Sequence, residues 1–280
     1  MLAPAPSRPE PLPAGAFRPE LDRRVGAFHW RAFGTLLGRE LKRVWKWAAM
    51  LVLAPALMAM LYFGVFAIGL GDNRGTATGD AVLDFLVPGL VMMSILMRAA
   101  ENPGFSLVYM KLEGFIIDQL MAPLGARETV PAYALAGTAA GMLSGFAVWA
   151  GAALLWWVPV EDPLMTLGFG LAGSLMMALV GMLVGIVSDK WDHISAYFTF
   201  LVMPLTFLSG AFAPVANMPE PMRLFVQANP IFYAIDGFRA GWLGTSHQDP
   251  AVSALVLAGS ILAVGAVVSW LFAKGYKLKA

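Results

Sequence analysis

Long stretches without a charged residue constrain this chain more than any other feature of its sequence. Two of them, Trp47–Gly71 and Thr129–Val160, contain 25 and 32 residues. As a helix, either is long enough to cross a hydrocarbon core about 30 Å thick. The second is longer than a crossing requires, so we expect it to tilt or to extend beyond the bilayer.

The same pattern predicts four more spans. They begin near Phe85, Leu164, Ile194 and Pro250, and the last ends at Ala273. Hydrophobic residues make up 59% of the chain and charged residues only 13%, whereas soluble proteins carry about 25% charged residues. The expected fold is therefore an all-α polytopic membrane protein with six transmembrane helices in residues 47–280.

The basic residues are distributed unevenly over this arrangement. The two ends and the inner turns hold 15 of the 19 Lys and Arg residues, whereas three lie outside and Arg98 lies in between. Cytoplasmic segments of membrane proteins are enriched in Lys and Arg. The asymmetry predicts that both termini are cytoplasmic.

Several kinds of chemistry are missing from the sequence. There is no cysteine, which excludes disulfides, zinc–thiolate sites and iron–sulfur clusters. No GxxxxGK[ST] phosphate-binding loop occurs, so the chain is not expected to hydrolyse ATP. HExxH and GxSxG motifs are absent, and His29, His193 and His247 lie far apart. We expect no catalytic site, metal site, cofactor or nucleic-acid partner, and the energy for active transport must come from a partner or an ion gradient.

The N-terminal part divides into two regions. Residues 1–27 are rich in Pro and Ala and lack the apolar core of a signal peptide. We expect a flexible cytoplasmic tail there, with a Pro-rich docking peptide as the alternative. Residues 28–46 place apolar side chains at helical spacing among basic ones. Such an amphipathic helix lies in the headgroup region of a membrane, or forms the polar start of the first span.

The second span must carry charge into or near the membrane. Phe85–Met97 supplies only 13 uncharged residues, so a crossing helix has to include Arg98 and Glu101. Ionisable residues at this depth are costly and usually face the interior of a bundle. Their spacing of three residues lets them pair on a helix. We predict either a polar contact on a transport route or dimer seam, or a salt bridge at the inner headgroups.

A short amphipathic helix is expected where this span leaves the membrane, within Met110–Leu124. One helical face carries Leu112, Phe115, Ile116 and Leu120, and a proline ends the helix. Its apolar side needs a protein partner, or else it rests on the bilayer surface.

Glycine recurs every fourth residue in the third span, at Gly137, Gly141 and Gly145, and again at Gly181 and Gly185 in the fourth. Small residues at this spacing let another helix approach closely. We expect the neighbouring helix to belong to the same chain, with a second protomer as the alternative.

The region of about residues 209–246 combines large apolar side chains with several prolines. Irregular backbone at membrane depth is tolerated only where protein or a water-filled cavity satisfies its N–H and C=O groups. We therefore predict a re-entrant helical hairpin between the fifth and sixth spans. Asn229 and Pro230 begin its second half, where Asp236 and Arg239 are spaced to pair. The alternative is an ordinary extracytoplasmic loop with a solvated salt bridge.

Four pieces of sequence follow one another in an order found in one transporter family. They are FLVPGLVMMS at 85–94, EGFIIDQLMAPL at 113–124, DHIS at 192–195, and PLTFLSGAF at 204–212 followed by MP and by NPIFYAIDGFR at 229–239. Together they resemble the type-2 permeases of ATP-binding-cassette (ABC) exporters, and in particular bacterial inner-membrane transport permeases of the polysaccharide and drug exporter family.

The resemblance implies a homodimer of six-span permeases, served by two copies of a separate ATPase subunit that binds ATP and Mg²⁺. In the family, the segment at about residues 110–122 is a coupling helix that docks on the ATPase. Its candidates here are Glu113, Gly114, Phe115, Ile116, Asp118, Gln119 and Leu120.

The resemblance also implies that the hairpin forms an outer gate. The gate candidates are Ser209, Gly210, Asn229, Pro230, Asp236 and Arg239. Candidates to line a pathway are Phe207, Phe212, Phe232, Arg98 and Glu101. For the three phenylalanines, plain core packing is an equally good reading.

The expected function is export of a lipid, a lipid-linked glycan or an amphiphilic compound from the cytoplasm or inner leaflet across a bacterial inner membrane, in contact with membrane lipids. Two other classes are open. An ion-gradient-driven carrier or channel would show broken helices in matching halves or polar rings within its spans. An intramembrane enzyme would need a nucleophile and a base at span depth, and neither pattern is visible.

Overall fold

The computed structural model describes residues 28–69, 77–116, 124–212, 215 and 218–277, and all regular structure in these ranges is helical. Six helical stretches are long and apolar enough to cross a membrane: Ala48–Gly69, Ala81–Leu112, Ala126–Leu155, Pro163–Val187, Trp191–Ala211 and Pro250–Lys274. They coincide with the six predicted spans. The all-α, six-span fold is therefore confirmed, and the protein is a multi-pass membrane protein.

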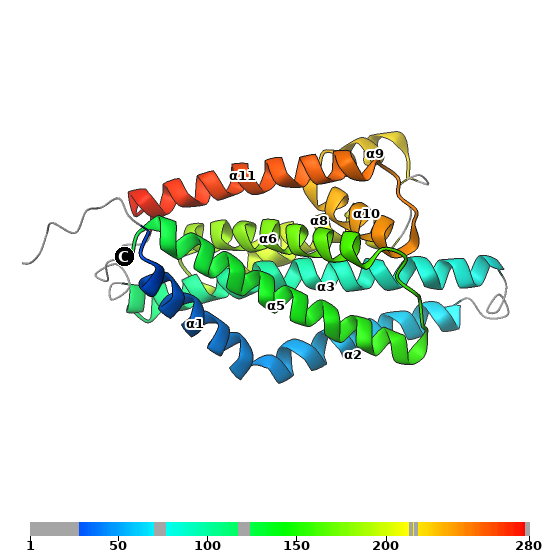
Figure 1. Cartoon of the computed structure of the whole chain (residues 1–280), viewed down its shortest axis with the longest axis horizontal. Helices are drawn as coiled ribbons and strands as arrows, with labels where there is room; N and C mark the ends of the chain where they lie inside the picture. Colours follow the sequence, from blue (N-terminus) through cyan, green and yellow to red (C-terminus); the bar gives the residue numbers. More distant parts are fainter. Residues whose placement is uncertain (1–27, 70–76, 117–123, 213–214, 216–217, 278–280) are drawn as a thin grey trace, which may run out of the picture.

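Five spans are single helices that run side by side along the long axis of the molecule (Figure 1). They are α2 (Ala48–Gly69), α3 (Ala77–Leu112), α5 (Ala126–Leu155), α6 (Pro163–Val187) and α11 (Pro250–Lys274). The fifth span in chain order is assembled from α7 (Trp191–Tyr197), the π-helical turn η2 (Phe198–Val202), α8 (Met203–Thr206) and the π-helical turn η3 (Phe207–Ala211). Three shorter helices complete the chain: α1 (Trp30–Lys46) before the first span, and α9 (Glu220–Gln227) and α10 (Pro230–Leu243) between the last two.

The long helix α3 is the centre of the bundle, and it makes its most extensive contacts with α5 and α6. The predicted glycines allow this approach. A Cβ atom at Gly141 would lie 2.7 Å from the carbonyl oxygen of Ile95, and one at Gly185 would lie 2.8 Å from that of Gly104. Any side chain at these two positions would push α5 or α6 away from α3. Close packing within one chain is thus confirmed for both helices.

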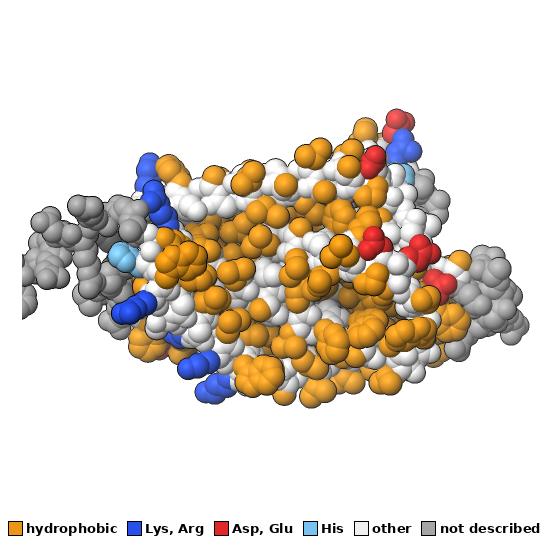
Figure 2. Space-filling model, in the orientation of Figure 1, with side chains coloured by type: hydrophobic (Ala, Val, Ile, Leu, Met, Phe, Trp, Pro, Cys, Tyr) orange, Lys and Arg blue, Asp and Glu red, His pale blue; other side chains and the backbone are white. Residues whose placement is uncertain are grey.

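The two ends of the bundle carry opposite charges (Figure 2). Basic side chains gather where α3, α6 and α11 finish, as at Lys111 and Lys274, and we call this the basic end. Acidic side chains gather where α6 and α11 begin, as at Asp162 and Asp249, and we call this the acidic end. The spans between the two ends present mainly hydrophobic side chains to the outside (Figure 2).

Three helices begin with the same local arrangement. Asp162, Asn229 and Asp249 each precede a proline, and each side chain accepts a hydrogen bond of 2.8–3.1 Å from a backbone N–H two or three residues later. Proline is suited to the first helical position because its missing N–H would have no intrahelical partner there. The predicted N-cap at Asn229 is confirmed.

Helix α1 is more than a surface helix. It packs on α5 and buries Glu40, which is only 2% exposed. The Glu40 carboxylate lies 2.8 Å from Arg43 and 3.1 Å from Arg39, and it accepts a hydrogen bond from Ser106 of α3. Arg39 and Arg43 thus have a protein partner within the bundle. They neutralise a carboxylate that joins α1 to the bundle.

Candidate functional site

The end of the fifth span and the start of α10 are tied together by one side chain. Gly210 has φ +84°, a conformation that favours glycine, and it turns the chain out of the span. The Asn229 side-chain N–H₂ donates to Ser209 Oγ at 2.8 Å and to the Leu205 carbonyl at 3.2 Å, while its oxygen accepts from the N–H of Ile231. Four of the predicted gate residues, Ser209, Gly210, Asn229 and Pro230, thus meet at one junction.

Asp236 lies on α10 and is 3% exposed. Its two carboxylate oxygens accept hydrogen bonds of 2.9 Å from the backbone N–H groups of His247 and Gln248. These bonds hold the turn that leads into α11. Within the described residues, Asp236 forms no ion pair with Arg239, so the prediction that these two residues pair is wrong.

The guanidinium group of Arg239 donates hydrogen bonds to backbone carbonyl groups instead. Arg239 is 7% exposed and donates to the carbonyl groups of Gly210 at 2.9 Å and Ala211 at 3.4 Å. Its guanidinium carbon lies 3.7 Å from the ring centroid of Phe85, a cation–π contact. Arg239 therefore fastens the kinked end of the fifth span to α3 and α10, while Asp236 fastens a different segment.

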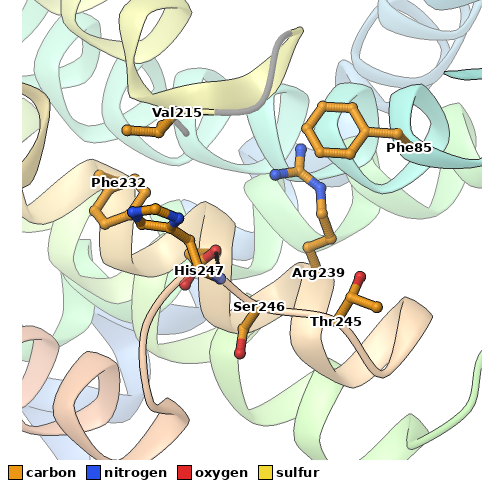
Figure 3. Close-up of a pocket in the computed structure, with 8 residues that line it drawn as sticks. Phe85, Val215, Phe232, Arg239, Thr245, Ser246 and His247 are labelled. Atoms are coloured by element: carbon orange, nitrogen blue, oxygen red, sulfur yellow. Dashed lines mark hydrogen bonds between the residues drawn. The ribbon is translucent and has the colours of Figure 1, made fainter. Parts of the chain in front are cut away.

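A cavity of about 190 Å³ lies beside these two residues at the acidic end (Figure 3). Its deep part is buried and includes Arg239, Asp236 and Phe232, and its rim at residues 245–247 is exposed. In Figure 3 the guanidinium group of Arg239 points away from α10 towards Phe85. The complete lining is Phe85, Val215, Phe232, Asp236, Arg239, Thr245, Ser246 and His247.

A second hollow of about 240 Å³ lies further along α3 and is formed by α2, α3, α5 and Met203. We call it the methionine groove, because Met58, Met93, Met97 and Met203 line it. Arg98 and Glu101 also line it, and their nitrogen and oxygen atoms are 2.9 Å apart. The predicted ion pair is thus confirmed, and it is surrounded by flexible thioether side chains that adapt easily to a ligand.

The three predicted pathway phenylalanines lie in two different places. Phe207 and Phe212 stack with a centroid distance of 5.0 Å, and Phe212 also contacts Tyr62 and Phe66 of α2. Tyr62 belongs to the lining of the methionine groove, so this aromatic cluster borders it. Phe232 instead lines the cavity at the acidic end and packs with Val215 and Val226.

The predicted coupling helix begins differently from the expectation. Helix α3 continues to Leu112, and Gly114 then breaks it with φ +76°. Phe115 is 49% exposed and its ring contacts that of Tyr109, whereas Ile116 is 2% exposed and packs in the core. Phe115 thus lies at the surface and Ile116 faces the core, and the turn at Gly114 separates both from Leu112 at the end of α3. Asp118, Gln119 and Leu120 lie outside the described residues.

A comparison with protein families now bears on this arrangement. The family described as ABC-2 type transporter matches residues 31–243. The chain belongs to this family. Inner membrane transport permease YadH of Escherichia coli strain K12 is 30% identical over 218 residues, which are 77% of this chain and 84% of the relative. Nodulation protein J of Rhizobium leguminosarum bv. viciae is 26% identical over 238 residues, or 79% of this chain and 84% of the relative. As an ABC-2 permease, the chain is the membrane component of a transporter.

Lys111 is a residue of this ABC-2 permease that sequence reasoning missed. Its ammonium group donates to the carbonyl groups of Gly185, Ile186 and Ser188 at 3.2, 2.8 and 2.6 Å. A positive charge at this place stabilises the carboxyl end of α6. Because α3 ends one residue later, the end of α3 is attached to α6. An isolated lysine at the end of an apolar span was the available signal.

The buried carboxylate of α1 was missed as well. Glu40 joins Arg39 and Arg43, and Arg39 also donates to the hydroxyl of Tyr133 on α5 at 3.2 Å. The signal was present in the sequence, since Glu40 is the one acidic residue within residues 28–46. A lone acid among bases on an amphipathic helix indicates a buried pairing rather than a lipid-facing surface.

Proposed function

We propose that this chain is the permease subunit of an ATP-driven exporter that moves a lipid, a lipid-linked glycan or an amphiphilic compound out of the cytoplasm or inner leaflet. The observation that carries the proposal is the methionine groove, an apolar hollow with one ion pair, Arg98–Glu101, at span depth. Ligand sites are mostly apolar with a few placed polar groups, and ionisable residues within spans usually mark a substrate route. A cargo with an apolar body and a polar head suits such a lining.

The basic end is the cytoplasmic end in this proposal, since Lys and Arg favour cytoplasmic segments. Both termini are then inside, and the cavity at Arg239 opens outside. The name of the E. coli relative, inner membrane transport permease, supports a bacterial inner membrane as the location. Two copies of the chain would form the transport unit, with membrane lipids around them.

The energy would come from two ATPase subunits that bind ATP and Mg²⁺ outside this chain. Phe115 is exposed at the basic end and is therefore available to a docking partner. A push on the coupling segment would reach α3 directly and α6 through Lys111. These two helices carry the tightest glycine contacts of the bundle, so they would move together rather than slide.

The aromatic cluster of Phe207 and Phe212 would close the methionine groove towards the acidic end. Gly210 lies between these two phenylalanines in the sequence, and its left-handed conformation is the point at which the fifth span ends. The junction at Asn229 would then act as the outer gate. Movement of α3 against this junction would separate the rings and let the cargo leave.

The test is co-purification of the ATPase subunit with wild-type permease and with Phe115→Asp. Since Phe115 is half exposed, the charge should leave folding intact but weaken docking on an apolar surface. We expect loss of co-purification and of permease-stimulated ATPase activity. The matched control is Phe225→Asp, because Phe225 is equally exposed but lies on α9 at the opposite end.

Two results would change the proposal. Unchanged docking of the ATPase on Phe115→Asp would contradict the assignment of Phe115 to a coupling helix. Failure of the wild-type permease to bind any ATPase would favour an ion-gradient-driven carrier or channel. The groove is tested separately by Met97→Trp, which should block transport while docking and ATP hydrolysis persist.

A further inference from the structure

The cavity at the acidic end contains a buried cation, the guanidinium group of Arg239. Arg239 is among the most buried charged residues described, and no carboxylate of a described residue forms an ion pair with it. Its Nε–H is buried and has no hydrogen-bond partner in the part of the chain that the structure describes. An ionised group in a protein interior is unfavourable unless an opposite charge or enough hydrogen bonds compensate it. The two carbonyl groups and the Phe85 ring that Arg239 contacts provide part of this compensation and leave the Nε–H without a partner among the described residues.

Asp236 lies one helical turn away from the cation but forms no ion pair with it. Both of its carboxylate oxygens are occupied by backbone N–H groups, those of His247 and Gln248. These bonds turn the carboxylate towards the loop before α11. Asp236 therefore holds the cavity rim in place.

The rest of the lining supplies donors rather than further negative charge. Thr245 and Ser246 carry hydroxyl groups and His247 carries an imidazole, and all three are exposed at the rim. The volume of about 190 Å³ is far above the ~10–15 Å³ that a single water molecule requires. A guanidinium group presents parallel N–H donors that match the oxygens of phosphate and carboxylate groups.

We propose that this cavity binds an anionic phosphate group, with Arg239 as the buried charge and Ser246 and His247 as donors at the rim. In so far as it names the cargo, the proposal rests on the proposed function: the anionic group is then the head group of the exported amphiphile, held at the acidic end after it leaves the methionine groove. A purely structural Arg239, which only fastens Gly210 and Ala211, would bind no anion.

The experiment measures the thermal unfolding midpoint of the intact permease in an uncharged maltoside detergent, which contains no phosphate. One arm titrates inorganic phosphate against chloride at equal ionic strength. A second arm titrates dioctanoyl phosphatidic acid against dioctanoylglycerol, which has the same chains and no phosphate. We expect a saturable rise of the midpoint with the phosphate-bearing probe in at least one arm. A rise only with phosphatidic acid identifies a lipid head group as the ligand, and a rise with both probes identifies phosphate itself.

Variants locate the effect. Ser246→Ala and His247→Ala change exposed rim residues, so they should fold normally and weaken probe binding about tenfold, while Arg239→Gln should abolish it. Arg223→Gln is the matched control, because Arg223 also lies near the acidic end, on α9, but does not line the cavity. No saturable rise in either arm overturns the proposal. An equal rise in the wild type and in all rim variants overturns it too, since the anion would then bind elsewhere.

The two proposals fail separately. If the ATPase subunit docks on the wild-type permease but no anion effect is seen, the anion site alone is wrong. If the anion effect is present and depends on the rim, but no ATPase docks, the exporter assignment alone is wrong.

Discussion

The protein buries acidic residues near basic residues in two places, and the partners that these residues bind differ between the two places. At the basic end, Glu40 is enclosed by Arg39, Arg43 and Ser106, so that its charge is matched within the chain. At the acidic end, Asp236 and Arg239 lie three residues apart on one helix and yet each binds backbone groups of a different segment. Similar residues therefore serve two purposes.

The difference shows that one buried charge can serve stability while another serves function. A matched carboxylate cannot respond to a ligand, because its partners already neutralise it, and it acts as a fastener between α1, α3 and α5. A buried cation that forms no ion pair within the described residues, such as Arg239, remains receptive to an anion. The buried carboxylate at the basic end is therefore matched within the chain, whereas Arg239 at the acidic end is able to bind an anion.

The largest effect should follow removal of the matched carboxylate. Glu40→Gln leaves two guanidinium groups without their acid, which should lower the free energy of unfolding by about 3 kcal/mol. Chemical unfolding of the purified permease measures this loss. The control is Glu220→Gln on α9, an exposed acid that should cost almost nothing. A loss at Glu40 as small as that at Glu220 would show that the basic end is not fastened by this charge.

A double-mutant cycle compares the two places directly. Residues in one ion-pair network couple by about 0.5–3 kcal/mol, whereas independent residues are additive within roughly 0.5 kcal/mol. We expect Glu40→Gln and Arg43→Gln to couple by about 2 kcal/mol within that range. Asp236→Asn and Arg239→Gln should be nearly additive. The free energies of unfolding of the wild type, the single variants and the double variant of each pair measure the coupling. Strong coupling between Asp236 and Arg239 would restore the pair that the sequence suggested and remove the contrast.

A smaller effect is expected at the junction that supports the acidic end. Asn229→Ala removes the N-cap of α10 and should cost about 1 kcal/mol of unfolding free energy, as helix caps do. Asn229→Asp keeps the capping oxygen for Ile231 but loses the donation to Leu205 and Ser209. If both variants are equally destabilised, the clamp on the fifth span matters more than the cap.

The smallest effect should come from an exposed pair at the basic end. A hydrogen bond of 2.7 Å from Lys277 lowers the pKa of Asp189 and raises the pKa of Lys277. The lowered pKa of Asp189 stabilises the fold above the carboxyl's usual pKa of 3.8, and this contribution is lost as the pH falls through the lowered value. The raised pKa of Lys277 stabilises the fold below the amine's usual value of 10.5, and this contribution is lost at higher pH.

Lys277→Met should therefore lower the thermal midpoint slightly at pH 7 and hardly at all at pH 2. Melting curves of both proteins at the two pH values measure this. Lys190→Met, at an exposed lysine beside Asp189, is the control. A difference that stays the same at both pH values would show that the Lys277 stem contributes by packing and not by its charge.

The sequence was sufficient for the fold because its signals are long and redundant. Uncharged runs marked each span, and glycine spacing marked the contacts of α5 and α6 with α3. The site was less accessible, because spacing says which groups can meet and not which partners compete for them. Arg98 and Glu101 had no competitor and paired as expected, whereas backbone groups of Gly210 and His247 drew Arg239 and Asp236 apart. Contacts between distant segments are harder still: the isolated Lys111 indicates that a partner is needed, but no local pattern identifies that partner as the end of α6.

The 36 residues of α3 give it a length of about 54 Å at ~1.5 Å per residue, well beyond a hydrocarbon core of about 30 Å. One helix therefore passes from Phe85 in the cavity at the acidic end to Lys111 at the basic end. A membrane with shorter acyl chains is thinner, and a helix that is longer than the membrane is thick tilts within it. Pro88 and Pro103 lie within α3 and are the points where such a tilt turns into a bend. We therefore expect the acyl-chain length of the host membrane to change the tilt of α3, and through α3 to affect both ends of the protein at once.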